Sequence, residues 1–134
     1  MNQRKLYVGS KIIHATPQIN TDTNRPGYQV TYEDGYTSWS PKDVFEKAYC
    51  ENGSLTSGMA IDLAQGGERI VRRRSWAQGK YLFQKNLNGQ PRLFIEYYDG
   101  SHTHYAPTPE DLVAVDWVFF DAKEFVKEQV EQNV

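Results

Sequence analysis

The sequence lacks the residue patterns that mark secreted and membrane-spanning proteins. Its 134 residues include a single cysteine, Cys50, which excludes an intramolecular disulfide framework and a cysteine-rich zinc site. No apolar run approaches the roughly 20 residues that a helix needs to cross a bilayer. The N-terminus is basic, but no hydrophobic signal core follows it. We therefore expect a cytoplasmic protein that does not enter a membrane.

The sequence also has little excess positive charge. Fifteen Lys and Arg stand against 17 Asp and Glu, which gives a net charge of −2, and the pI is near 5.9. Proteins that bind duplex nucleic acid usually carry a basic footprint, so we expect no such partner. A small anionic ligand is still compatible with this composition, because a pocket needs only local positive charge.

Catalytic and metal-binding motifs are missing as well. The three histidines do not have the His-Glu-x-x-His spacing, and no Gly-x-Ser-x-Gly elbow or phosphate-binding loop occurs. His102 and His104 would share one face of a strand, but two ligands without a third make a weak metal site. A surface pair is the favoured interpretation. We therefore expect no enzyme, no metal and no cofactor.

Aromatic residues, in contrast, make up 13% of the chain, and short alternating segments lie between turn signals. This pattern predicts an α+β fold, mainly antiparallel sheet with short helices packed on one face. Residues 5–15 and 28–32 are expected strands, and the second continues through an Asp-Gly turn into a hairpin. A helix should follow, with Ser40 as its N-cap and Pro41 as its first residue.

A short polar segment at 51–54 is the expected boundary between two parts of the chain. Residues 1–50 would form a strand–hairpin–helix unit and residues 55–134 a second domain, although the two could also form one compact domain. In the second part we predict a helix at 59–64, strands beginning at 70, 80, 92 and 116, and a closing amphipathic helix at 122–132.

The strongest candidate site is a basic cluster in which Arg72, Arg73 and Arg74 come shortly before Trp76. Guanidinium groups bind phosphate in a forked geometry, and an indole ring can stack on a base. On a strand, Arg73 would face the side of Val71 and would need an anion there, while Arg72 and Arg74 would face the other side. The alternative is a solvated edge strand whose charges block aggregation.

Four other residues extend this candidate site. The Ala-Gln-Gly stretch after Trp76 would let the ring stand free at the mouth of a pocket, and packing in the core is the alternative. Tyr81 and Phe83 share a strand face and would flank the same pocket. Asp116 begins an apolar strand, so its carboxylate must be exposed, paired with Arg73 or bound to a ligand hydroxyl or base edge. The predicted ligand-binding residues are Arg72, Arg73, Arg74, Trp76, Tyr81, Phe83 and Asp116.

The order of these motifs resembles a phage family. A helix, the run Val71-Arg-Arg-Arg-Ser-Trp76, an aromatic strand and the run Asp111-Leu-Val-Ala-Val-Asp-Trp117 are similar to the Thoeris anti-defence 2 proteins over about residues 57–120. Members of that family are small sponges that sequester cyclic nucleotide immune signals of bacteria. Val115 departs from the pattern, since the family usually has an acidic residue there. The first 50 residues are similar to short phage proteins of unknown function.

The resemblance implies a function that needs no chemistry. The protein would act in the cytoplasm of an infected bacterium and bind a cyclic nucleotide or cyclic ADP-ribose-type signal of Thoeris or CBASS immunity without cleaving it. It would do so as a homo-oligomer, a dimer or a tetramer, as the family does. One alternative is a phage factor that binds a host protein through an aromatic surface, which the Tyr-rich N-terminal part favours. A nuclease or phosphodiesterase is a second alternative, and it would require turnover.

Overall fold

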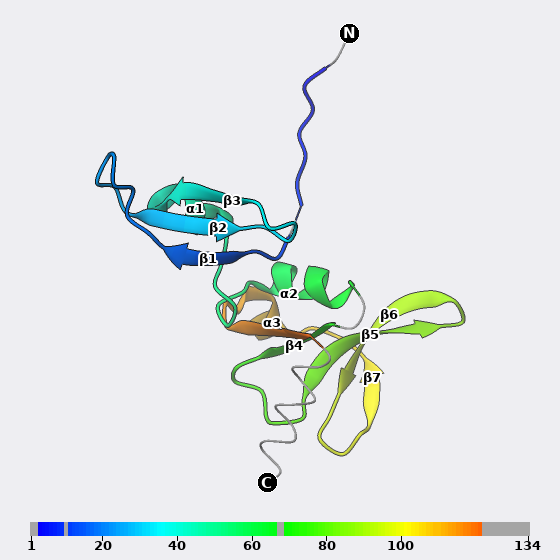
Figure 1. The fold of residues 1–134 in the computed structure, drawn as a ribbon. Coiled ribbons are helices and arrows are strands. Elements are labelled where there is room, and N and C mark those ends of the chain that lie inside the picture. Colours follow the sequence, from blue (N-terminus) through cyan, green and yellow to red (C-terminus); the bar gives the residue numbers. More distant parts are fainter. Residues whose placement is uncertain (1–2, 10, 67–68, 122–134) are drawn as a thin grey trace. The chain divides into compact units, whose positions relative to one another are not determined.

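A computed structural model describes residues 3–9, 11–66 and 69–121 of the chain. The described residues form two antiparallel sheets and three short helices, so the predicted α+β class is confirmed (Figure 1). The chain divides into two compact units, Met1–Cys50 and Glu51–Val134. The closing helix predicted at 122–132 lies outside the described residues.

The first unit is a three-stranded sheet in the order β1-β2-β3 with one helix. Its elements are β1 (His14–Pro17), β2 (Gly27–Thr31), β3 (Thr37–Pro41) and α1 (Lys42–Ala48). Val30 of β2 is almost completely buried. The helix is attached by aromatic stacking, since Phe45 lies 4.2 Å from Tyr28, measured between ring centroids, and also stacks on Tyr49. This hairpin and helix agree with the predicted unit.

Two details of the first unit differ from the sequence prediction. The predicted strand at 5–15 is wrong over most of its length, because only β1 pairs with β2. The ladder begins at the pair His14–Thr31, and β2 ends at Thr31, so the described residues before His14 are not part of this ladder. The predicted helix start is also wrong. The backbone of Ser40 belongs to β3, where it pairs with Tyr28, and the helix begins after Pro41 without a side-chain cap.

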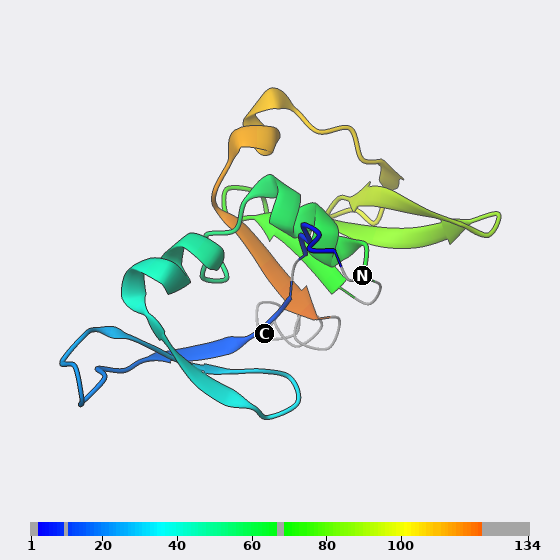
Figure 2. The ribbon, with the colours of Figure 1, turned by 90° about the horizontal axis from the view of Figure 1, so that it is seen from above.

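The second unit is a five-stranded sheet in the order β7-β6-β5-β4-β8. Its strands are β4 (Arg69–Arg73), β5 (Tyr81–Leu87), β6 (Gln90–Glu96), β7 (His102–His104) and β8 (Trp117–Asp121), and its helices are α2 (Ser57–Ala64) and α3 (Pro109–Val113). Helix α2 lies across one face of the sheet, and the chain passes from β7 through α3 before β8 returns beside β4 (Figures 1 and 2).

Local sequence explains the ends of these elements. The side chain of Thr56 accepts a hydrogen bond of 3.2 Å from the amide of Met59 and so caps α2. Thr108 and Asp111 form a reciprocal capping box at the start of α3. The turn between β5 and β6 is the predicted Asn88-Gly89 pair, in which both residues have positive φ, as a two-residue hairpin turn requires.

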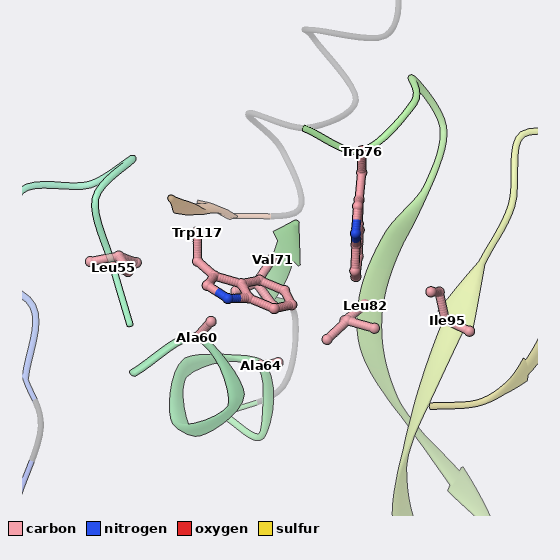
Figure 3. Packing of buried hydrophobic residues seen from close by; sticks show 8 residues of the cluster. All are labelled: Leu55, Ala60, Ala64, Val71, Trp76, Leu82, Ile95 and Trp117. Atoms are coloured by element: carbon pink, nitrogen blue, oxygen red, sulfur yellow. The ribbon is translucent and has the colours of Figure 1, made fainter. Parts of the chain in front are cut away.

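The core of the second unit lies between α2 and the sheet (Figure 3). Val71, Leu82 and Trp117 are fully buried on the strand side, and Ala60 and Ala64 are fully buried on the helix side. Val71 pairs with Leu82 across the ladder, so both side chains lie on the same face of the sheet. This pair determines which residues of β4 and β5 face the core and which face the other side. The small helix residues allow α2 to lie close above the large Trp117 ring.

The segment before α2 closes the outer edge of β8. Leu55 and Trp117 exchange two backbone hydrogen bonds of 3.2 Å. Three residues earlier, the side-chain amide of Asn52 donates to the carbonyl of Phe119 at 2.8 Å and accepts from its amide at 2.7 Å. The polar segment predicted as a boundary is therefore hydrogen-bonded to the sheet of the second unit, and it protects an edge strand.

Candidate functional site

Arg73, the middle residue of the run Arg72–Arg74, is part of an ion-pair cluster. Nε of Arg73 donates to Oδ1 of Asp116 at 3.0 Å, and Nη2 lies 3.4 Å from Oδ2 of the same carboxylate. Nη1 of Arg73 donates to Oδ1 of Asp111 at 3.2 Å. The hydrogen bond to Asp116, and then the one to Asp111, raises the pKa of Arg73 against the effect of burial. Of the three alternatives for the Asp116 carboxylate, the structure shows the pairing with Arg73.

Asp111 is a member of this cluster that the sequence prediction did not include. It is 93% buried, with an exposed fraction of 7%, and its other oxygen accepts from the amide of Thr108 in the capping box. Its backbone carbonyl accepts from Nε1 of Trp117 at 3.3 Å. In the sequence, the capping-box spacing Thr108-x-x-Asp111 before an apolar residue is the signal that could have identified Asp111. One guanidinium between two carboxylates leaves a formal charge of −1, so this cluster has no cation to spare for a phosphate.

Trp76 is buried in the core. Its exposed fraction is 9%, and its ring meets the Trp117 ring edge-on with 5.1 Å between centroids (Figure 3). Nζ of Lys80 lies 4.6 Å from the centre of the Trp76 ring. The predicted ring standing free at a pocket mouth is therefore wrong. The turn closed by the bond from the Trp76 amide to the Arg73 carbonyl, 3.2 Å long, brings the ring back over the sheet.

The opposite face of the same sheet carries an aromatic cluster. Because Val71 and Leu82 point toward α2, alternation places Tyr81 and Phe83 of β5 on the other side. Register then brings Phe94 of β6 beside Phe83 and His104 of β7 beside Phe94. We call the set on this side the aromatic face. It consists of Tyr81, Phe83, Phe94, His102 and His104.

The rings of the aromatic face are in mutual contact. His104 stacks on Phe94 with 4.6 Å between centroids, and Phe83 lies 6.0 Å from Phe94 in a stacked arrangement. His102 meets both phenyl rings edge-on, at 5.6 Å from Phe94 and 6.0 Å from Phe83. Phe94 is buried beneath its neighbours, whereas both imidazoles are exposed. The face thus presents a continuous aromatic surface with exposed ring nitrogens.

Cations surround this surface. Nζ of Lys85 lies 6.0 Å from the centre of the Phe94 ring, and Lys85 is opposite Arg92 in the ladder. Arg72 alternates to the same side of the sheet, and its guanidinium donates to the carbonyl of Trp76 at 3.1 Å. The acidic neighbour is Glu96, which accepts a hydrogen bond from the hydroxyl of Tyr81. Burial and Glu96 raise the pKa of Tyr81. Local charge is therefore positive in a chain of net charge −2.

The structure divides the predicted site residues between two places. Arg73, Trp76 and Asp116 belong to the packed side of the sheet, with α2 and α3, whereas Arg72, Tyr81 and Phe83 belong to the other side. Arg74 follows the end of β4, and its guanidinium lies against Gly53, where an added Cβ would come within 2.6 Å of Nη2. A single pocket formed by all seven residues is therefore wrong, because a sheet separates the two groups.

Within residues 3–9, 11–66 and 69–121, no group of three or more His, Cys, Asp or Glu side chains is placed to hold a metal ion. None of the helices in the part of the chain that the structure describes is long and apolar enough to cross a membrane.

The second unit is thus a small α+β domain with one packed face and one aromatic, cationic face. Residues 55–120 match the model of the Tad2-like family, described as the Thoeris anti-defense 2-like domain, so the second unit is similar to that family over these residues. The match supports a role in Thoeris anti-defence, and it supports the interpretation that the chain is a phage protein. No curated protein matches the chain.

Proposed function

We propose that the Tad2-like domain binds a cyclic nucleotide or cyclic ADP-ribose-type immune signal on its aromatic face and holds it without cleavage. The observation that supports this best is the combination of stacked rings with Lys85, Arg92 and Arg72 on one side of the sheet. Bases stack on aromatic rings, and ammonium and guanidinium groups bind phosphates. Withholding the signal from its host effector then requires no catalytic group.

Each part of the face has a role in this proposal. Phe83 and the exposed imidazole of His104 offer ring faces for a base, since each base has an aromatic face of its own. Lys85 and Arg92, opposite each other at one end of the face, would bind a phosphate. On the packed side, the Arg73 cluster holds α3 against the sheet and so supports the shape of the domain.

Sequestration also demands high affinity. Depleting a messenger requires nanomolar binding or better, which corresponds to about −12 kcal/mol. A single sheet face contacts only one side of a flat ligand, and a second copy of the chain would cover the other side. We therefore propose a homo-oligomer, a dimer or a tetramer, in the bound form. Light scattering coupled to size exclusion measures this mass directly with and without ligand.

Calorimetric titration with a panel of cyclic dinucleotides and ADP-ribose derivatives tests the binding. Phe83→Ala should weaken binding by about tenfold to a hundredfold, because a stacked base contributes roughly 1–3 kcal/mol. Arg74→Gln is the matched control, since Arg74 lies outside the aromatic face. Unchanged affinity in Phe83→Ala with a lower affinity in Arg74→Gln would contradict the proposed location.

The same titration separates capture from cleavage. Heat denaturation of the complex should release the intact nucleotide in an amount equal to the binding stoichiometry, and mass spectrometry identifies it. Accumulation of a linear or hydrolysed product under turnover conditions would contradict sequestration and support the nuclease alternative.

A further inference from the structure

The first unit contains a concave site of its own, beside the turn between β2 and β3. A cavity of about 410 Å³ lies between residues 11–13 and the turn. Its lining residues include Tyr32 and Tyr36, whose rings stack with 5.8 Å between centroids, and the acidic residues Glu33 and Asp34. Two π faces together with two carboxylates are a combination that attracts organic cations.

A cation from the chain itself already lies in this cavity. Nζ of Lys11 is 4.5 Å from the centre of the Tyr32 ring, in cation–π geometry. Tyr36, the other ring, is 65% exposed and so presents most of its surface to solvent. The ammonium of Lys11 thus marks the chemistry that suits the cavity, and the lining also includes a second ring and two acidic residues.

The turn holds this geometry without a ligand. The amide of Tyr32 donates to the carbonyl of Tyr36 at 2.8 Å, and the amide of Gly35 donates to the carbonyl of Tyr32 at 2.9 Å. Oδ1 of Asp34 accepts from the amide of Tyr36 at 2.9 Å, which fixes the carboxylate beside the ring. A site whose walls are ordered before binding loses little conformational entropy when a ligand enters.

We propose that this cavity binds a lysine side chain of a partner protein, and that Lys11 occupies part of the site until the partner arrives. Exposed apolar residues that precede the cavity-lining residues in the sequence favour a protein over a free amine. The segment before the cavity exposes Leu6, Tyr7 and Val8 to 91%, 85% and 92%, and such apolar side chains supply the contact area that a protein interface needs. The site would give the first unit a binding activity independent of nucleotide capture.

Titration of the isotope-labelled full chain with short peptides, followed by amide NMR, tests the proposal. The probe is acetyl-Gly-Lys-Gly-amide, and its control is the same peptide with acetylated lysine, which lacks the charge. The lysine peptide should shift the amides of residues 32–36 in a saturable way, while the control peptide leaves them unchanged. Equal shifts with both peptides, or no saturable shift with either, would overturn the proposal.

Two variants and a small amine sharpen the test. Lys11→Met keeps an unbranched side chain but removes the competing ammonium, so the lysine peptide should bind about two- to fivefold more tightly. Tyr36→Leu should abolish the saturable shifts while leaving the remaining spectrum unchanged. Weaker binding in Lys11→Met would show that Lys11 does not compete with the peptide and would overturn the proposal. If butylammonium binds as tightly as the peptide, the site is assigned to free amines, and the proposal of a protein partner is overturned.

Discussion

At the scale of single residues, the two tryptophans of the Tad2-like domain show how one ring supports another. Trp117 is fully buried, and Trp76 closes the core at its side with an edge-on contact (Figure 3). Arg73 precedes both tryptophans in the sequence, and its two carboxylate partners anchor α3 and the start of β8. These side chains maintain the packed side of the sheet, on which the geometry of the aromatic face depends.

Trp76→Ala is therefore expected to destabilise the domain. Removing a large buried ring leaves a cavity, which typically costs about 3–5 kcal/mol. Urea unfolding followed by circular dichroism measures this loss. Phe83→Ala, on the other face, should cost less because Phe83 is only half-buried. A Trp76→Ala protein with wild-type stability and lost nucleotide binding would instead support the stacking role expected from the sequence.

Tyr105 gives the domain a dependence on alkaline pH. Burial, and then the Asp111 carboxylate, raise its pKa from 10 to about 12. The native state therefore holds the phenol proton more tightly than the unfolded chain does. This contribution to stability is complete below pH 10 and is lost as the pH rises through about 12.

The expected loss is about 1–2 kcal/mol, since one pKa unit corresponds to about 1.4 kcal/mol. Urea unfolding at pH 9 and at pH 11.5 measures it. In Tyr105→Phe the decrease between the two pH values should be smaller, with the remainder due to Tyr81, whose pKa is also raised. An identical decrease in the wild type and in Tyr105→Phe would contradict the assignment.

At the scale of elements, the two Asp-Gly turns have the same hydrogen bonds. In the first unit, the Tyr32 and Gly35 amides close the turn at 2.8 and 2.9 Å; in the second, the Tyr97 and Gly100 amides do so at 2.9 Å each. Gly35 and Gly100 both have positive φ, of 89° and 85°. The two turns thus share their local geometry, which follows from the chemistry of the Asp-Gly pair.

Two glycines, Gly79 between β4 and β5 and Gly89 between β5 and β6, form a matched pair for experiment. Gly79 and Gly89 have φ of 85° and 80°, so alanine is strained at both. A Cβ at Gly79 would lie 2.9 Å from the Cα of Tyr98, whereas at Gly89 it would meet no atom within 4 Å. Gly89→Ala should cost about 1–2 kcal/mol, and Gly79→Ala should cost clearly more. Thermal unfolding of both variants measures the difference, and equal losses would contradict the close contact with Tyr98.

Sequence patterns predict those elements whose cause is local. The Asn88-Gly89 turn and the alternation that places Arg73 on the side of Val71 depend on neighbouring residues, and both are found. The position of Trp76 depends on a turn and on Trp117, which is distant in sequence, so the flexible stretch after the ring gave the wrong expectation. Likewise, no local pattern shows that Tyr81 and Arg73 lie on opposite sides of a sheet, because this depends on the register between β4 and β5.

At the scale of the whole molecule, the two units have separate cores, and the two proposed binding surfaces belong to different units. Val30 and the Tyr28–Phe45 stack serve the first unit, and the cluster around Trp117 serves the second. The aromatic face and the Tyr32–Tyr36 cavity carry different chemistry, one suited to anionic nucleotides and the other to cations. A protein built in this way would bind two kinds of ligand with one chain.

Truncation tests the independence of the second unit. A fragment that begins at Glu51 should fold and keep the nucleotide affinity of the full chain. A fragment that begins at Leu55 loses the two hydrogen bonds of Asn52, so it should be less stable by about 1–2 kcal/mol. Urea unfolding and calorimetry measure both quantities. Failure of the Glu51 fragment to fold would show that the first unit is required.

The hydrogen bonds of the Asn52 side chain limit where the coding sequence of this domain can be joined to another. A coding segment that is transferred by recombination retains its fold only if it includes every residue that completes its sheet. The family match begins at residue 55, but the hydrogen bonds to Phe119 begin at Asn52. A crossover placed at the match boundary would leave β8 with part of its edge unpaired and open to association with other chains. Recombination junctions that preserve the fold of the domain are therefore expected upstream of the codon for Asn52.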